Sequence, residues 1–391
     1  MKNYIILLAA LINFLAAHNV AAQTTEENEG VAFVHDKTFD QALAQAKQEG
    51  KMLFIDCYTS WCGPCKMLAS KVFPQKKVGD YFNQVFVSMK VDMEKGEGVE
   101  LKKRFAVKAF PTLLFISNDG KEINRIVGAE LNIDKFLKNV KEGIGENSLS
   151  AMNERYAKGE RDMEFLIDYL EVLGRAYDTK KCEEVTALLL EGNEKYMLEK
   201  EELYNAFIEY NKCPLSSACL YVMDNKEAFE AKYDKTKLNQ TLDFMWMAYP
   251  YKFIQKNEDG TCSFDEEGMN AYKAEMKKRK VAKADEICLN VDIALAEAQK
   301  DWKKYASLCD RHIKKYGEED MTLYNWVLRI QKNCSDPVVK KKATGWMKRR
   351  LDKIAKEKAN EKPLPPGMMR AMPMVNFEAQ YEKLIKELEN N

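Results

Sequence analysis

The chain has 391 residues, and its 61 lysine and arginine residues are balanced by 61 aspartate and glutamate residues. This length predicts two to three domains, and the balanced charge leaves no bulk field to attract nucleic acid or an anionic membrane. The sequence has no basic block and no glycine-rich phosphate-binding loop, so we do not expect nucleic acid as a partner.

The first 22 residues have the pattern of a secretory signal peptide. Lys2 provides a basic start, Tyr4 to Ala17 form an apolar core, and Val20-Ala21-Ala22 are small residues at a cleavage site. The apolar core is short for a membrane span, and position 23 is Gln23 rather than the cysteine of a bacterial lipoprotein. We therefore predict export with cleavage of residues 1–22, and an uncleaved anchor is the alternative.

Residues 31–145 show the alternation of helices and strands that is typical of an α/β domain. Thr38-Phe39-Asp40-Gln41 fits a capping box, which opens a helix that ends at Gly50. Lys51 to Tyr58 is a short apolar run, the pattern of a central strand buried on both faces. A single acid, Asp56, interrupts it.

Two cysteines follow this strand at the start of the next helix, in the stretch Trp61-Cys62-Gly63-Pro64-Cys65-Lys66. A helix N-terminus offers unpaired amides and the positive end of a dipole, which stabilise a thiolate on Cys62. Cys65 lies one helical turn further on, so it can attack a mixed disulfide and close an intramolecular bridge. We therefore predict that the two cysteines form a redox-active pair.

The rest of this domain is expected to continue the alternation. The predicted elements are a helical turn at 78–82, a strand at 85–91, a helix at 96–105, a strand at 113–116, a turn at 119–121 into a last strand ending at Gly128, and a helix at 132–140. Gly143, Gly145, Asn147 and Ser148 mark a linker after the last helix.

Taken together, these features resemble the thioredoxin superfamily. The stretch from Trp61 to Lys66 matches its active-site motif, and Asp56 lies six residues before Cys62, where thioredoxins keep a buried acid. Phe110-Pro111-Thr112 stands where the family places a cis-proline beside the active site. The resemblance implies an α/β thioredoxin fold and a thiol–disulfide oxidoreductase that needs no cofactor.

The resemblance also implies roles for individual residues. Cys62 is the expected nucleophile, Cys65 the resolving cysteine, and Asp56 the group that relays the proton of Cys65. A solvated carboxylate at the strand end is the alternative for Asp56. The expected substrate-binding residues are Trp61, Gly63, Pro64, Phe110 and Pro111.

Two departures from the family pattern bear on potential and substrate choice. Phe110 is bulkier than the small or β-branched residue that commonly precedes the proline, and Ser88 takes the expected place of a partner lysine on the neighbouring strand. Gly63-Pro64 between the cysteines resembles reducing thioredoxins. We therefore predict reduction or isomerisation of disulfides in exported proteins, in the periplasm, with electrons from a membrane thiol carrier.

Zinc binding is the main competing interpretation of two cysteines at this spacing. It requires a second pair of ligands, and after the signal only His35 and His312 remain, neither with a partner at zinc spacing. No metal is therefore expected. Cys57 on the buried strand is predicted to be an inert core residue. Seven further cysteines have unassigned pairing: Cys182, Cys213, Cys219, Cys262, Cys288, Cys309 and Cys334.

From Leu149 onward the sequence turns rich in lysine and glutamate, with apolar residues at helical spacing. We predict an all-α domain at 149–360 built of helical hairpins, similar in rhythm to tetratricopeptide repeats but without their full consensus. A Pro/Met-rich linker at 361–374 and a C-terminal helix within 375–391 are expected to follow. The helical domain is a candidate site for a protein partner.

Two other functions fit these features. In one, the helical half is a protein-binding scaffold and the thioredoxin-like domain recruits or tethers. In the other, the protein is a thiol reductant for cytochrome c assembly, although nothing in the sequence singles out an apocytochrome.

Overall fold

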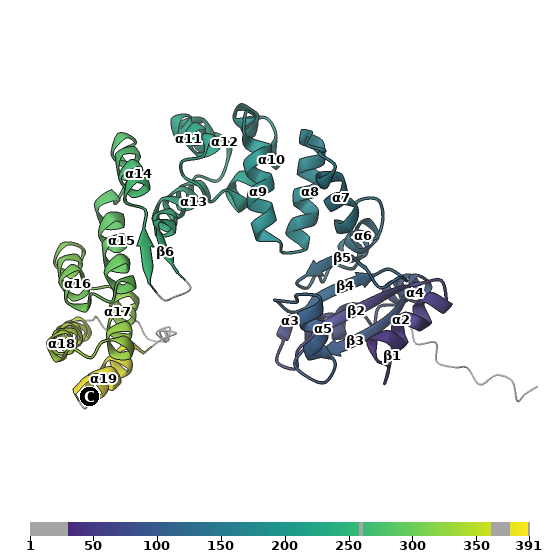
Figure 1. Cartoon of the computed structure of the whole chain (residues 1–391), viewed down its shortest axis with the longest axis horizontal. Helices are drawn as coiled ribbons and strands as arrows, with labels where there is room; N and C mark the ends of the chain where they lie inside the picture. Colours follow the sequence, from purple (N-terminus) through teal and green to yellow (C-terminus); the bar gives the residue numbers. More distant parts are fainter. Residues whose placement is uncertain (1–29, 258–260, 361–375, 390–391) are drawn as a thin grey trace, which may run out of the picture. The chain divides into compact units, whose positions relative to one another are not determined.

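The computed structural model describes residues 30–257, 261–360 and 376–389. The predicted signal peptide and the predicted linker at 361–374 lie outside these residues. The chain divides into two compact units, one up to Asn211 and one from Lys212, and their elements can be followed in Figure 1. The first unit therefore contains the α/β domain together with the helices that directly follow it.

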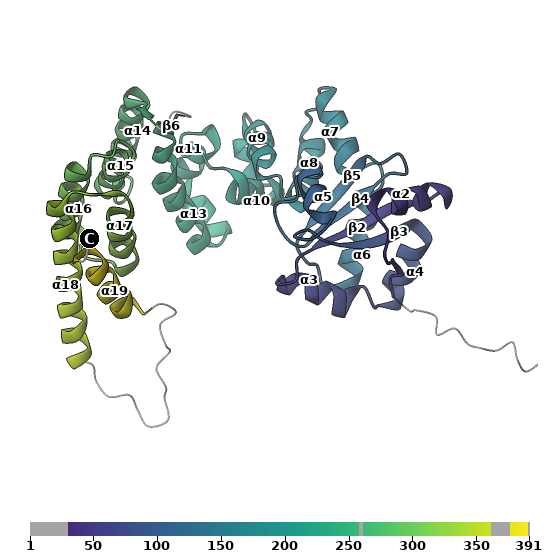
Figure 2. The same cartoon turned by 60° about the horizontal axis from the view of Figure 1, so that its bottom comes forward.

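The first unit is organised around a five-stranded sheet in the order β1-β3-β2-β4-β5. The strands are β1 (Phe33–Val34), β2 (Met52–Tyr58), β3 (Phe86–Asp92), β4 (Thr112–Ile116) and β5 (Glu122–Val127). β3 runs parallel to both β1 and β2, whereas β4 runs antiparallel to both β2 and β5. β2 lies between β3 and β4 (Figure 2), which confirms the predicted central strand.

Helices contribute to a separate core on each face of this sheet. They are α2 (Phe39–Gln48), α3 (Gly63–Met67) continued by the π-helical turn η1 (Leu68–Val72), α4 (Lys76–Val85), α5 (Gly98–Arg104) and α6 (Ile133–Gly143). α2 and α5 pack with Leu53, Ile55 and Cys57 of β2. η1, α4 and α6 pack with Phe54 on the other face. The two-residue period of β2 thus divides its side chains between the cores.

Local signals explain where the first helix begins. The Thr38 hydroxyl accepts a hydrogen bond from the Gln41 amide at 3.3 Å, and the Gln41 side chain accepts one from the Thr38 amide at 2.9 Å. This reciprocal pair is the predicted capping box, and it satisfies two amides that the start of the helix would otherwise leave unpaired. The prediction of a helix after Thr38 is confirmed.

Five helical elements follow the α/β domain within the first unit, and the first two of them pack against its sheet. They are α7 (Leu149–Ala157), α8 (Met163–Arg175), α9 (Thr179–Leu190), the 3₁₀ turn η2 (Glu194–Leu198) and α10 (Glu201–Tyr210). α7 and α8 contact β5. The Arg175 guanidinium on α8 donates to Glu142 at 3.0 Å and to Asn139 at 3.4 Å, both on α6. These contacts fix the first helical hairpin at the β5 edge of the sheet.

The second unit is helical except for one short hairpin. Its helical elements are α11 (Ser217–Asp224), α12 (Lys226–Lys232), α13 (Lys235–Ala248), η3 (Tyr249–Phe253), α14 (Glu266–Lys278), α15 (Ala284–Ala298), α16 (Trp302–Tyr316), α17 (Asp320–Asn333), α18 (Pro337–Ala359) and α19 (Phe377–Glu389). Among the described residues, none of the helices has both the length and the apolar composition for crossing a membrane.

The hairpin corrects the expectation that this half is all-α. β6 (Ile254–Lys256) pairs antiparallel with β7 (Cys262–Phe264). Ile254 lies opposite Phe264, a β-branched and an aromatic residue of the kind that favours strand pairing. The predicted helical character is confirmed, and Phe377–Glu389 forms the expected C-terminal helix.

Asp336-Pro337 marks the start of α18. α17 stops at Asn333, and the Asp336 carboxylate then accepts the Val338 amide at 2.8 Å to cap α18. Pro337 is the first residue of α18, where a missing amide hydrogen is no loss. The two residues thus begin α18 shortly after α17 has ended.

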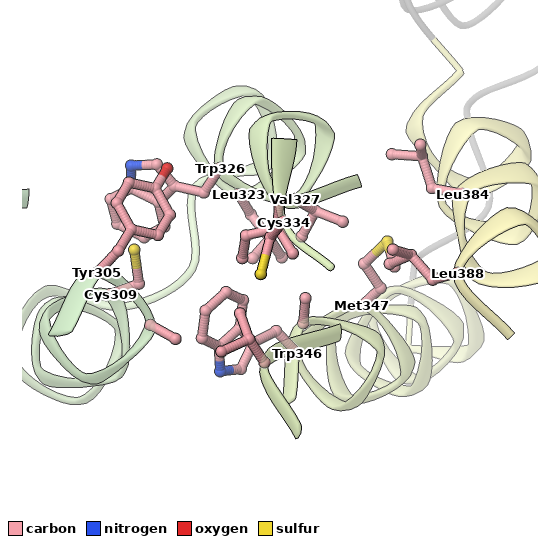
Figure 3. Close-up of a cluster of buried hydrophobic side chains, with 14 of the residues drawn as sticks. Tyr305, Cys309, Leu323, Trp326, Val327, Cys334, Trp346, Met347, Leu384 and Leu388 are labelled. Atoms are coloured by element: carbon pink, nitrogen blue, oxygen red, sulfur yellow. The ribbon is translucent and has the colours of Figure 1, made fainter. Parts of the chain in front are cut away.

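A large apolar cluster holds α15 to α19 together (Figure 3). At its centre Trp346 is fully buried, and its indole nitrogen donates to Asp310 at 2.5 Å. Met347 of α18 lies with Leu384 and Leu388 of α19 in the same cluster. The C-terminal helix is thus part of this core.

We expect Trp346→Ala to lower the free energy of unfolding of the second unit by about 3–5 kcal/mol, because the deletion leaves a cavity and removes the indole donor from Asp310. The matched change Trp61→Ala removes an indole that is 65% exposed, and it should cost at most about 0.5 kcal/mol. Urea unfolding followed by circular dichroism compares the two variants. Equal losses would contradict the packing described for Trp346.

Candidate active site

The two predicted redox cysteines form a disulfide at the N-terminus of α3. Cys62 is the N-cap residue, and its sulfur accepts a hydrogen bond from the Cys65 amide at 3.1 Å. The Cα atoms of Cys62 and Cys65 are 5.3 Å apart. Pro64 lies in the first turn of the helix, where it interrupts no hydrogen bond. The amide that holds the sulfur would equally stabilise a thiolate there.

The surroundings of the disulfide form a rim over two nearly buried sulfurs. Cys62 and Cys65 are only 2% and 4% exposed. By contrast, Gly63 and Pro64 are exposed, as is Trp61. A partner molecule approaching the disulfide must therefore first contact these rim residues.

Trp61 connects the cysteine turn to the loop before β4. Its indole nitrogen donates to the Glu94 carboxylate at 3.0 Å. Its ring meets the Phe110 ring edge-on, with centroids 6.0 Å apart. The bulky residue at 110, noted as a departure from the family pattern, thus supports the tryptophan at the rim.

The Phe110–Pro111 peptide bond is cis, as the resemblance implied. The loop is fixed on both sides, because the Pro111 carbonyl accepts the Gly128 amide at 2.9 Å and the Thr112 hydroxyl donates to the Ala109 carbonyl at 2.8 Å. The expected substrate-binding residues Trp61, Phe110 and their neighbours are therefore brought together by the fold.

Asp56 is a buried carboxylate with one charged partner. It is 0% exposed, and Lys90 Nζ lies 2.9 Å from its Oδ2. Burial raises the pKa of Asp56, and the nearby Lys90 charge opposes part of that rise. The same ammonium also lies 5.0 Å and 5.1 Å from the ring centroids of Phe33 and Phe73. The lysine is therefore held by aromatic rings as well as by the carboxylate.

This pair corrects the expectation that Ser88 replaces the partner lysine. In the parallel pairing of β2 with β3, Asp56 lies opposite Lys90, whereas Ser88 lies opposite Phe54. Side chains two residues apart on a strand share a face. The sequence prediction therefore chose the correct face of β3 but the wrong residue on it, Ser88 instead of Lys90. A usable signal was present, since Lys90 is the single basic residue of a strand that is otherwise nearly buried.

Cys57 neighbours Asp56 on β2 but points into the opposite core. It is 0% exposed, and burial together with the negative charge of Asp56 raises the pKa of its thiol well above the ordinary value. Its predicted place in the core is confirmed.

The cysteines beyond the α/β domain are not paired with one another. Cys219 carries a free buried thiol whose pKa burial raises to about 12, and burial raises the pKa of Cys182 to about 11. The Cys213 thiol donates to the Tyr249 hydroxyl at 3.3 Å. No disulfide joins Cys213 to Cys219. Within the described ranges, no group of three or more His, Cys, Asp or Glu residues is placed to hold a metal ion.

Comparison with known proteins agrees with this geometry. The thioredoxin family model matches residues 30–142. A thioredoxin H-type protein of Oryza sativa subsp. indica is 33% identical over 132 residues, which are 32% of this chain and 96% of that protein. The thiol:disulfide interchange protein DsbD of Pseudoalteromonas atlantica is 32% identical over 93 residues, 23% of this chain and 16% of that protein.

A solved structure is also similar over the same part of the chain. The solution structure of a candidate disulphide-isomerase from Bacteroides thetaiotaomicron is 53% identical, covering 29% of this chain and 93% of that one with a TM-score of 0.28.

The sheet, the helix-capping cysteine pair and the cis-proline loop define a thioredoxin-type redox domain. The chain belongs to the thioredoxin family. It is a thiol–disulfide oxidoreductase, with a helical part that continues beyond the segment matched by the family.

Proposed function

We propose that the protein is exported and reduces or isomerises disulfides of extracytoplasmic proteins. The observation that carries this proposal is the Cys62–Cys65 disulfide at a helix N-terminus, close to the cis-Pro111 loop. Export is supported by the signal pattern of residues 1–22. We place the protein in the periplasm on this ground.

The reaction begins with the pair reduced. The Cys62 thiolate attacks one sulfur of a substrate disulfide, so that a Cys62–substrate disulfide forms and the other substrate sulfur leaves as a thiolate that takes a proton. Cys65 then attacks Cys62, which releases the second substrate thiol. Two electrons have passed to the substrate, and the protein is left with its Cys62–Cys65 disulfide. If a second substrate thiol attacks instead, the substrate isomerises and the pair stays reduced.

Asp56 is assigned to the proton of Cys65 in the second step. Its side chain lies on the same face of β2 as Phe54, the face on which η1 packs directly after the cysteine helix. A carboxylate whose pKa is raised by burial is a better base than an ordinary one. Lys90 holds this carboxylate in place through the 2.9 Å ion pair.

Substrate binding is assigned to the exposed rim and to the loop at Pro111. Trp61, Gly63 and Pro64 provide the surface around the sulfurs. A proline at 111 has no amide hydrogen, so the backbone of Phe110 provides the donor and acceptor on which an extended substrate segment can pair.

The oxidised protein must be reduced again for a second turnover as a reductase. Exported compartments are kept oxidising, so we assign this step to a thiol carrier in the membrane, whose two thiolates would repeat the exchange in reverse.

The reduction potential of the Cys62/Cys65 pair tests the proposal. We expect a value near −270 mV for a reductase, or about −180 mV for an isomerase. Titration of the mature protein in glutathione buffers gives the potential, and Cys62→Ser provides the background from the other thiols. A value near the −120 mV of strong oxidants, or the absence of a titrating pair, would contradict the assigned direction of electron flow.

A further inference from the structure

A groove of about 330 Å³ lies beside the cis-proline loop in the first unit. One side comes from the α/β domain and the other from the helices that follow it. The residues that matter here are Ala109, Thr112, Arg125, Val127, Leu149 and Tyr177. The helices after the family-matched segment therefore complete a surface that the α/β domain alone would leave open.

The groove starts at the active-site end of the sheet. Ala109 and Thr112 flank the Phe110–Pro111 bond, and Phe110 contacts Trp61 of the cysteine turn. From there the groove follows β5, the edge strand of the sheet, from Val127 back to Glu122. Five steps along a strand span about 16 Å, which is enough for four or five extended residues.

Tyr177 stands on the helical side of this groove with its side chain 66% exposed. It follows the end of α8, where its amide bonds the Gly174 carbonyl at 3.0 Å and the next amide bonds Leu173 at 3.1 Å. Its φ is 58°, in the left-handed region where this type of helix cap normally uses glycine. Neither the cap nor core packing accounts for an aromatic side chain here.

The groove carries charges of both signs, of which Arg125 and Glu122 are paired with each other, whereas Lys108 is exposed. Arg125 makes two bonds to Glu122, at 2.6 Å and 2.7 Å, and a third to the Phe105 carbonyl at 2.8 Å. The Asp178 carboxylate accepts the Lys181 amide at 3.1 Å. The remaining surface includes small or apolar side chains such as Val127 and Leu149. Charges of both signs beside apolar side chains suit an extended polypeptide rather than a small anion.

We propose that Tyr177 is a specificity-determining residue, and that the groove holds the extended segment next to the cysteine of a substrate protein. This inference rests on the proposed function, because it requires Cys62 to form a disulfide with that cysteine. The occupant is a polypeptide because the groove continues from the loop at Ala109, which precedes the cis-proline, and is lined by Thr112 of β4 and by residues along the length of β5. The helical extension then selects substrates by the residues around their cysteine.

The test compares Tyr177→Gly with wild type as reduced full-length chains. Two of the probes are peptides of alanine, valine and serine with one central cysteine, one of about twelve residues and one of about four. The cysteine of each peptide is converted to its mixed disulfide with thionitrobenzoate. The third probe is the small disulfide DTNB. Glycine is favoured at this φ, so the variant should fold. We expect wild type to prefer the long peptide about tenfold over the short one, and Tyr177→Gly to lose most of that preference.

Lys280→Gly is the matched control. Lys280 has φ 53° and ends α14 with the same pair of bonds, its amide to Lys277 at 3.2 Å and the Val281 amide to Met276 at 3.0 Å. This control should keep the wild-type preference, and all three proteins should react equally with DTNB. Equal rates for the two peptides in wild type, or a preference retained in Tyr177→Gly, would overturn the groove alone. A reduced wild type that reacts with DTNB no faster than Cys62→Ser, which reports the other thiols, would overturn the proposed function and this inference with it.

Discussion

A chain carrying Cys65→Ser should accumulate as covalent mixed disulfides with its substrates, and its turnover should fall by at least about 10³-fold. The reason is that Cys62 remains at the helix N-terminus, where it keeps its stabilising amides. It can attack, but serine cannot release the bound substrate by a second exchange. Non-reducing electrophoresis of the variant after mixing with disulfide-containing periplasmic proteins shows the complexes, which should dissolve on addition of dithiothreitol.

The control for this trap is Cys62→Ser, which should form no such complexes, although it retains Cys65. A trap that forms through Cys65 instead would reverse the assigned roles of the two sulfurs. Complexes in both variants would point to one of the other thiols. Cys57 is an improbable source, because it is fully buried.

The second large effect is expected from Asp56→Asn, which keeps the size of the side chain but removes its charge. Release of the mixed disulfide by Cys65 should slow by about 10²-fold near pH 7, because a positioned base typically contributes this much. Stopped-flow measurement of the two exchange steps separates attack by Cys62, which should be little changed, from release. Equal slowing of both steps would contradict a role confined to the Cys65 proton.

The same variant should also be more stable at neutral pH. Burial raises the pKa of Asp56 in the folded chain above the value of 3.8, so the folded state binds a proton more readily than the unfolded one. The free energy of unfolding of the wild type therefore falls as pH rises from 3.8 through the pKa of Asp56 in the folded state. The total fall is about 1.4 kcal/mol for each unit by which that pKa exceeds 3.8.

Asparagine removes this loss, so its advantage should be full above the folded pKa and vanish in acid. Urea unfolding at a series of pH values checks the trend, with Asp119→Asn at an exposed turn as a comparison. A variant that is less stable than wild type at neutral pH would mean that the Lys90 partnership outweighs the cost of burial.

The α/β half could be predicted because its signals are local. The capping box at Thr38, the apolar run of β2 and the hairpin turn at Gly120 each specify structure within a few residues. The order of these elements then matched one family, which supplied Asp56 and the cis-proline that no local pattern specifies. The structure confirms that Asp56 is buried and that the Phe110–Pro111 bond is cis.

What could not be predicted depends on contacts between distant segments. Choosing Lys90 over Ser88 as the partner of Asp56 required the exact pairing of two parallel strands, which a helix separates in sequence. The docking of α8 through Arg175, and hence the groove at Tyr177, required knowing which edge of the sheet the helices cover. A lone exposed tyrosine in a helical sequence carries no signal for either.

The alternation along β2 has a consequence for chemical selectivity. Asp56 and Cys57 are neighbours in sequence, yet the strand places the acid on the face against which η1 packs and the thiol in the other core. On the face of Asp56, the Cys57 thiol could attack the mixed disulfide in place of Cys65. The resulting Cys57–Cys62 disulfide would stop turnover. Cys57 lies in the opposite core, and its raised pKa keeps the thiol protonated. The exchange is therefore confined to Cys62 and Cys65.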